Sequence, residues 1–173
     1  MNPIIENMIT RRSCKAYLPT PVPEELLEQV LLAGTYAANG KARQAAKIVV
    51  LTKPEDVADL ERRNAEVLGT PDAHPFYGAP VVLVVLGDAD IFTSLEDGSL
   101  VLGNMLLAAH SLGLGACWIH RAREEFASEE GKALLKKWGI EGNYIGVGHC
   151  VLGYAAKEPK PAAPRKKDYI VRV

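Results

Sequence analysis

The chain contains 173 residues, a length that fits about one domain and allows one sizeable hydrophobic core. Hydrophobic residues make up 48% and charged residues 24%, a balance that excludes disorder over most of the chain. The 20 Lys and Arg residues nearly match the 21 Asp and Glu residues, giving a net charge of −1. A general nucleic-acid or membrane-surface binder needs a basic excess, so neither partner is expected.

The three cysteines, Cys14, Cys117 and Cys150, are odd in number and far apart, so no disulfide framework is expected. The first residues lack the apolar stretch and the charged leader of a signal peptide. The longest apolar run of strand type, residues 80–87, is shorter than the roughly 18 residues that a membrane span requires. We therefore expect a cytoplasmic protein with a single domain over residues 1–173.

In the first half of the chain, helix and strand signals alternate. Asn2 is a good helix cap, Pro3 suits a first helical turn, and Gly69 is a plausible helix stop. In chain order, the expected elements are a helix from Asn2 to the basic residues 11–15, a helix from Pro23, a small-residue loop at 37–44, a strand at 47–52, a helix from Pro54 to Leu68 and a strand at 80–87 covered on both faces.

The second half begins with a helix whose apolar residues surround it almost completely, which places that helix in a core or an interface. The expected elements are a capping box at Ser94–Asp97 followed by this helix through Leu112, a buried strand at 116–119, an amphipathic helix at about 123–138, a strand at 145–153, an extended arm at 154–168 and a terminal strand at 169–173. These elements predict a mixed α+β domain with a C-terminal arm at residues 154–173.

Two basic clusters lie near the two ends of the chain: Arg11-Arg12-Ser13-x-Lys15 and residues 165–167. Guanidinium groups, a hydroxyl and an ammonium together suit a phosphate monoester. The same charges are also typical of a solvated surface, and the clusters alone leave both interpretations open.

The other motifs indicate little chemistry carried by side chains. Gly113 and Gly115 follow a helix and lack the third glycine of a dinucleotide-binding turn. Cys117 and His120 would point to opposite faces of a strand, so no metal site is expected. No catalytic triad or carboxylate pair is present, which predicts no catalytic side chain. Cys14, between basic residues, is either a reactive thiol or a small spacer.

Five segments in this order resemble the FMN-dependent nitroreductase family over nearly the whole chain. They are residues 9–17, residues 21–27 with the 37–44 loop, residues 79–85, residues 103–119, and Leu152-Gly153-Tyr154 with the basic cluster that follows. The resemblance implies an α+β fold with a mixed, mainly antiparallel sheet flanked by helices. It also implies an interlocked homodimer with two FMN sites at the interface.

The resemblance further implies a role for each basic residue. Arg11 and Ser13 would bind the phosphate or ribityl end of FMN, and Arg12 or Lys15 would face the N1/O2 edge. A cation at that edge stabilises the negative charge that reduction places there. Arg165 and Lys167 would return from the arm to the phosphate.

The remaining implied contacts come from the loop and from the sheet. The loop of the partner subunit would supply Asn39 and Gly40 to the ribityl chain and Gln44 to the polar edge of the ring. Beside the isoalloxazine would lie Pro80, Trp118 and Ile119, with a backbone N–H near His120 reaching N5.

Three positions depart from the family pattern. Ala42 stands where the family usually has asparagine, and Ala45 and Ala46 stand where it usually has proline and tryptophan. These departures remove one polar contact and one packing aromatic, so we expect an altered FMN affinity or pocket shape.

The implied reaction is ping-pong: NADH or NADPH delivers hydride to FMN and leaves, and a nitroaromatic, quinone or related small-molecule acceptor then takes the electrons. One alternative is a non-catalytic flavin-binding redox sensor that uses Cys14. Another keeps the fold but performs oxygen-dependent or dehalogenating flavin chemistry.

Overall fold

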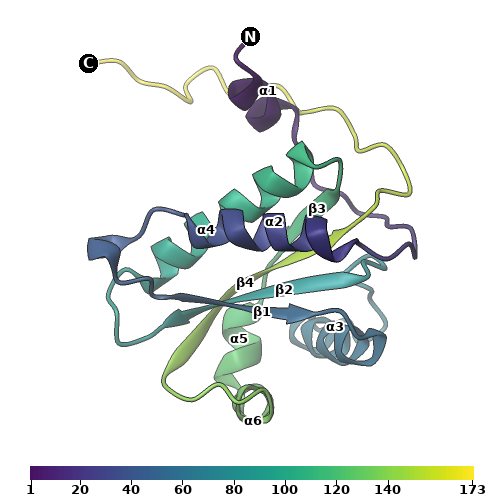
Figure 1. Ribbon diagram of the computed structural model, residues 1–173, viewed down its shortest axis with the longest axis vertical. Helices are drawn as coiled ribbons and strands as arrows, with labels where there is room; N and C mark the ends of the chain where they lie inside the picture. Colours follow the sequence, from purple (N-terminus) through teal and green to yellow (C-terminus); the bar gives the residue numbers. More distant parts are fainter.

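The computed structural model describes residues 1–173 and contains one four-stranded sheet in the order β1-β2-β4-β3 (Figure 1). Every neighbouring pair is antiparallel, and β1 and β3 are the edge strands. The strands are β1 (Ala46–Leu51), β2 (Val81–Asp88), β3 (Gly115–Ile119) and β4 (Tyr144–Gly153). The expected mixed α+β fold with a mainly antiparallel sheet is confirmed.

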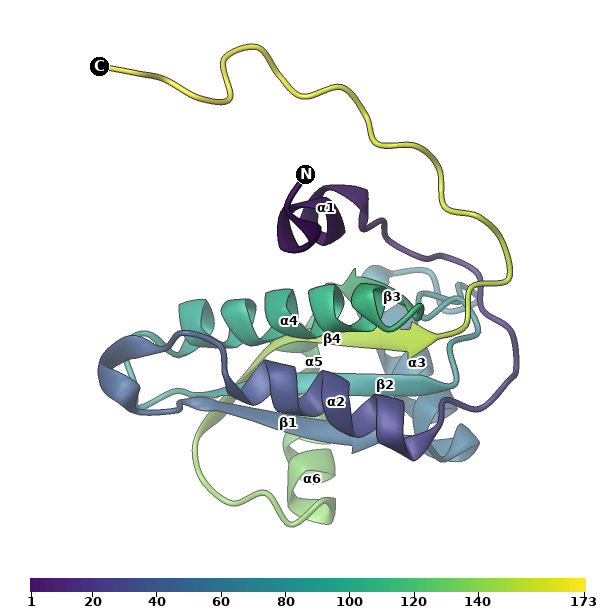
Figure 2. The ribbon, with the colours of Figure 1, turned by 45° about the horizontal axis from the view of Figure 1, so that its top comes forward.

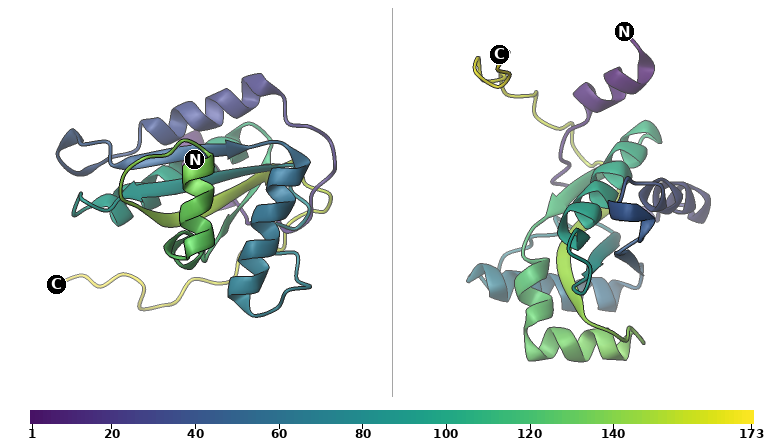
Figure 3. Two further views of the ribbon diagram at one scale, coloured as in Figure 1. Left: turned by 90° about the horizontal axis from the view of Figure 1, so that it is seen from below. Right: turned by 90° about the vertical axis from the view of Figure 1, so that its left-hand side faces the viewer.

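Helices cover both faces of the sheet (Figures 2 and 3). Helices α2 (Glu24–Thr35) and α4 (Ser94–Ser111) pack on one face. The other face is covered by α3 (Pro54–Leu68), α5 (Ala122–Ala127) and α6 (Glu129–Lys137). The central strand β2 is buried on both faces as predicted, because its alternate residues belong to the two different hydrophobic clusters.

Local signals set most of the element boundaries. The Asn2 side chain accepts a hydrogen bond from the Ile4 N–H (2.8 Å) and caps α1 (Pro3–Thr10). Gly69 ends α3 with a φ of 77°, which glycine adopts without the clash that a Cβ would cause. Helix α1 lies beside α4, where the Asn7 amide donates to the Leu107 carbonyl (3.0 Å). The termini of both α1 and α3 agree with the sequence predictions.

The predicted capping box at Ser94–Asp97 is wrong. The N-cap position is Thr93, which makes no side-chain capping bond, and Ser94 is the first residue of α4. Asp97 instead accepts hydrogen bonds from the Thr93 hydroxyl (3.0 Å) and the Gly40 N–H (2.9 Å). A distant loop has therefore taken the carboxylate that the local motif assigned to the helix terminus.

The single amphipathic helix predicted for residues 123–138 is two helices, α5 and α6, with Ser128 between them. The Ser128 hydroxyl donates to the Glu125 carbonyl (2.6 Å) and accepts from the Gly131 N–H (2.9 Å). A Cβ at Gly131 would collide with the Glu125 carbonyl, so the tight corner requires glycine at this position. The apolar residues of α5 and α6 follow one continuous helical pattern in the sequence, so this pattern does not indicate the break.

Two further expectations fail at exposed sites. Trp118 on β3 is 51% exposed, so this strand is not buried along its whole length. Residues 169–173 form no strand, because no strand of the single chain lies beside them. The arm at residues 154–173 extends away from the sheet (Figure 2). No helix has both the length and the apolar content needed to cross a membrane.

Candidate functional site

A basic pocket of about 690 Å³ lies between the end of α1 and the C-terminal arm. We call it the arginine pocket; it is lined by Met8, Ile9, Arg11, Arg12, Ser13, Pro161, Ala162, Ala163 and Arg165. Both basic clusters therefore contribute to one cavity, although they are about 150 residues apart in the sequence. Lys15 and Lys167 do not line it.

The three arginines of this pocket differ in their hydrogen bonding. Arg12 donates from Nη1 to the carbonyls of Ile9 and Arg11 (both 2.7 Å) and closes the end of α1. Arg165 donates to the Ala163 carbonyl (2.6 and 3.2 Å). Arg11 Nη1 is buried and has no partner. A buried charged donor without an acceptor is unfavourable, so this arrangement fits an anionic ligand that supplies oxygen atoms.

The segment after the arginines is attached to the edge strand β3. Ser13 forms a parallel bridge with Ala116, and the Cys14 N–H donates to the Ala116 carbonyl (3.0 Å). Lys15 is exposed, and its Nζ lies 5.8 Å from the centre of the Tyr77 ring. Tyr77 has a φ of 57°, an uncommon conformation for a residue with a side chain.

The cysteines are buried thiols, which argues against the reactive-thiol interpretation of Cys14. Cys14 is 2% exposed and its Sγ donates to the Ala16 carbonyl (3.2 Å). Burial raises the pKa of Cys117, although the Ser13 hydroxyl, Lys15 and Arg11 oppose the shift. Burial also raises the pKa of Cys150 to about 12. Cys117 and Cys150 therefore remain protonated at neutral pH.

The apolar residues expected beside a ligand ring do not share one surface. Trp118 is half exposed and lies over Gly148 of β4, next to Leu102 of α4. Ile119 points the other way and is 5% exposed in the core beneath α3 and α5, so only its backbone reaches the Trp118 side. Pro80 lines a separate pocket of about 360 Å³ beside α3.

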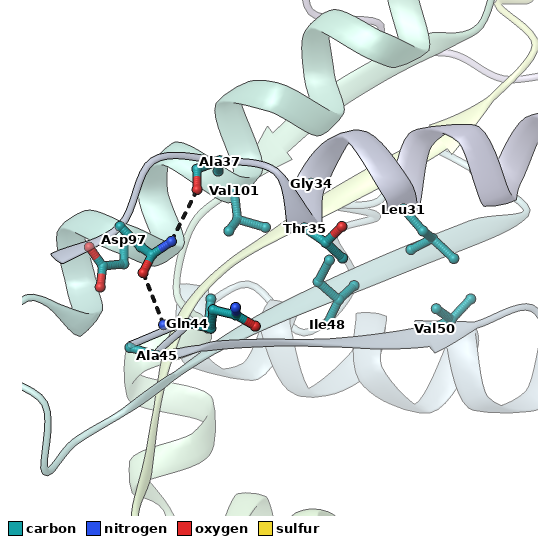
Figure 4. A pocket seen from close by; sticks show the side chains of 12 residues that line it. Leu31, Gly34, Thr35, Ala37, Gln44, Ala45, Ile48, Val50, Asp97 and Val101 are labelled. Carbon is teal, nitrogen blue, oxygen red and sulfur yellow. Dashed lines mark hydrogen bonds between the residues drawn. The ribbon is translucent and has the colours of Figure 1, made fainter. Parts of the chain in front are cut away.

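The loop after α2 forms another pocket, of about 330 Å³, between α2, β1 and α4 (Figure 4). Asn39 and Gln44 line it, and the Asn39 side chain accepts from the Gln44 N–H (3.0 Å). Asp97, which also lines this pocket, accepts the hydrogen bond from the Gly40 N–H described above. Lys41, Ala42 and Gln44 have φ values between 51° and 55°, so the loop is held in a conformation that such residues rarely adopt.

The single chain thus brings together Arg11, Arg12, Ser13 and Arg165 but places Asn39, Gly40 and Gln44 elsewhere. The two pockets have no residue in common. Sequence reasoning missed Asp97 and Tyr77 in these surroundings. Asp97 was assigned to a capping motif, which hid its hydrogen bond to Gly40. Tyr77 is far from Lys15 in the sequence and comes near it only because residues 69–80 fold back toward it.

Comparison with known proteins gives the family. The model of the nitroreductase family matches residues 8–154. This chain belongs to the nitroreductase family. A relative from Methanothermobacter thermautotrophicus, named an NADH dehydrogenase/NAD(P)H nitroreductase, is 31% identical over 166 residues, which cover 90% of this chain and 79% of that protein.

Solved structures of nitroreductases have the same fold. The FMN-bound nitroreductase from Bacteroides fragilis superposes with a TM-score of 0.91 at 25% identity and covers all of both chains. The FMN-bound nitroreductase from Desulfitobacterium hafniense has a TM-score of 0.89 at 27% identity, over 100% of this chain and 99% of that one. The family match includes the arginine segment and the 37–44 loop and ends at Tyr154, the first residue of the arm.

Proposed function

We propose that this nitroreductase binds FMN in the arginine pocket and uses NADH or NADPH to reduce small nitroaromatic, quinone or related acceptors. The observation that carries the proposal is the buried, unpartnered Nη1 of Arg11 in a pocket lined by Ser13 and Arg165. The FMN-bound relatives of the same fold and the NAD(P)H nitroreductase relative support it. The enzyme is an NAD(P)H-dependent flavin oxidoreductase.

In this proposal Arg11, Ser13 and Arg165 bind the FMN phosphate. Lys167, two residues after Arg165 in the same basic cluster, would approach the phosphate from the arm. Two forked guanidinium groups and a hydroxyl supply the donors that a phosphate accepts. Arg12 is occupied by two carbonyls, so we assign the N1/O2 edge of the ring to Lys15, whose exposed ammonium group lies over the Tyr77 ring and makes no hydrogen bond within the chain.

The ring would lie against Trp118, with the backbone after Ile119 at its N5 edge; Pro80 lines a separate pocket beside α3 and is not assigned to the ring. When bound, FMN supplies the redox chemistry, accepting hydride from NAD(P)H and returning electrons to an acceptor. The protein contributes binding, orientation and a positive charge at the edge of the ring. Lys15 there favours the reduced cofactor, since an opposite charge nearby stabilises a developing anion.

We further propose a homodimer in which the partner subunit supplies Asn39, Gly40 and Gln44. Within one chain Asn39 and Gln44 line a different pocket from Arg11, and Gly40 lies in the same loop, so a second copy is needed to bring both sets to one ligand. Apolar side chains that a partner would cover are exposed on α1 and at the C-terminus. They are Ile4, Ile5, Met8, Ile9, Tyr169, Ile170 and Val171.

Steady-state NADH and NADPH oxidation by the FMN-loaded protein tests the proposed reaction. Nitroaromatic and quinone acceptors are compared under nitrogen and under air. Turnover that requires one of these acceptors under nitrogen supports the proposal, whereas turnover only in air indicates oxygen-dependent flavin chemistry. Bound FMN without any NAD(P)H oxidation would refute it and indicate a flavin-binding protein without catalysis.

A further inference from the structure

A buried polar network connects the core beneath the sheet to the corner between β3 and α5. Its members are Asn64 of α3, Glu125 of α5 and His149 of β4, which are 0%, 3% and 0% exposed, with Arg121 at the corner itself. None of the four lines the arginine pocket or the loop pocket. Burying so many polar groups is unfavourable unless each finds a partner, so their role needs an explanation.

Asn64 is the centre of the network. Its Oδ1 accepts two hydrogen bonds from Arg121, from Nε (3.0 Å) and Nη2 (2.8 Å). Its Nδ2 donates to the backbone carbonyl of His120 (2.9 Å) and to the Glu125 carboxylate. One amide thus holds both residues of the corner, one by its backbone and one by its side chain.

Glu125 and His149 hold Asn64 in this orientation. The second carboxylate oxygen of Glu125 lies 2.6 Å from His149 Nε2, and the imidazole packs edge-on against the rings of Phe76 and Phe126. With one carboxylate oxygen on His149 and the other on Asn64, the amide group can present only its NH₂ side to Glu125. Asn64 Oδ1 is therefore directed to Arg121.

The backbone at this corner is strained. Arg121 has a φ of 82°, a left-handed conformation that residues with a Cβ rarely adopt. Such a conformation persists only where the surrounding structure enforces it, and such residues concentrate at functional sites. The fork of hydrogen bonds from Arg121 to Asn64 supplies that constraint.

The corner directly follows β3, the edge strand to which the Ser13–Cys14 segment of the candidate site is attached. β3 binds the Ser13–Cys14 segment at Ala116, presents the half-exposed Trp118, and ends one residue before His120. The edge of β3 thus runs from Ala116, beside Ser13 of the arginine pocket, past Trp118, and the backbone of residues 119–121 extends this edge. In the proposed FMN complex this backbone lies at the reactive edge of the ring.

We propose that Asn64 is a positioning residue: through its bonds to His120 and Arg121 it fixes the backbone that faces the flavin ring. This inference rests on the proposed FMN function. Asn64 does not touch the ligand, and Glu125 and His149 set the orientation of its amide. The network thus links the core beneath the sheet to the geometry at the edge of the ring.

The test compares wild type with Asn64→Leu and with Arg121→Leu. Arg121→Leu removes the half-exposed guanidinium group that bonds to Asn64 and leaves Asn64 paired with Glu125. Leu134→Ala, in the core at α6 and outside the network, is the control for loss of stability alone. Three quantities are measured: the backbone amide exchange of residues 119–122 in the FMN-free protein, the midpoint potential of bound FMN, and the Kd of FMN.

We expect both network variants to exchange at least about tenfold faster at residues 119–122, to bind FMN about tenfold more weakly and to shift its midpoint potential, since each variant loses both hydrogen bonds between Arg121 and Asn64. Leu134→Ala should lower the melting temperature and leave these values unchanged. Wild-type exchange and potential in Arg121→Leu would overturn the inference while leaving the proposed function intact. A wild-type protein that binds no FMN would overturn the proposed function, and the inference with it.

Discussion

Replacement of Arg11 by alanine should separate ligand binding from stability. In the free protein Arg11 Nη1 is buried without a partner, so its removal takes away an unsatisfied donor rather than a formed hydrogen bond. We therefore expect Arg11→Ala to change the free energy of unfolding of the FMN-free protein by no more than about 0.5 kcal/mol. The matched control is Arg123→Ala, at an exposed position on α5 outside the arginine pocket.

FMN binding should respond strongly to the same change. A hydrogen bond to a charged group contributes about 1.5–3 kcal/mol, which corresponds to a Kd raised about 10- to 150-fold. Arg11→Lys should fall between wild type and Arg11→Ala, because lysine keeps the charge but lacks the forked donors. FMN titration followed by quenching of flavin fluorescence measures the Kd values, and urea unfolding of the FMN-free proteins measures their stability.

Equal Kd values for Arg11→Ala and Arg123→Ala would refute the assignment of Arg11 to the phosphate. An Arg11→Ala variant that loses several kcal/mol of stability would also contradict the reasoning, since it would show that the guanidinium group is already satisfied in the free protein.

Three further variants test other parts of the account. Burial raises the pKa of Asp59, but hydrogen bonds from two arginines of α3 outweigh it and hold this pKa below its ordinary 3.8. Asp59→Asn should therefore lower the free energy of unfolding by about 0.5 kcal/mol at pH 7, and in urea unfolding the difference from wild type should vanish as the pH falls below 3.8 through the folded pKa. Burial and the two arginines after α1 lower the pKa of His110 below its ordinary 6.5. The wild-type free energy of unfolding should therefore decrease as the pH falls from 6.5 through the folded pKa, and His110→Asn should flatten the stability–pH curve in this range. An unchanged curve would show that His110 is not the group responsible. A Cβ at Gly148 would collide with the Trp118 indole, so Gly148→Ala should destabilise the protein by about 1–3 kcal/mol and shift the tryptophan emission, and unaltered emission would show that the ring is not packed there.

The sheet and most helices could be predicted because their signals are local. The apolar run of β2 predicts a strand buried on both faces, and Asn2 and Gly69 mark helix termini through their own backbone and side-chain chemistry. Each of these features depends on a few neighbouring residues, so the printed sequence contains all that is needed.

The errors arise where a distant segment competes with the local pattern. Asp97 matches a capping box, yet the Gly40 loop takes its carboxylate. Ser128 divides a continuous amphipathic pattern because the chain turns to pack α6 against α5. Periodicity shows which face of a segment is apolar, but it does not show where the segment bends.

The candidate site was predictable in its chemistry but not in its assembly. The arginine and hydroxyl pattern at residues 11–13 indicates an anion, and the fold brings Arg165 to the same pocket. The opposite orientation of Trp118 and Ile119 follows from strand alternation once β3 is placed. The pairing of Asn64 with Arg121 depends on how α3 packs beside α5, which no short motif encodes.

Native mass spectrometry of the wild-type protein, purified in the presence of FMN, measures both the oligomeric state and the number of FMN molecules bound. We expect a dimer that carries two FMN molecules, because the proposed site combines Arg11 of one chain with Asn39 of the other, and these two residues lie in different pockets of a single chain. A monomer that stays free of flavin in excess FMN would contradict the proposed cofactor and the proposed shared site together.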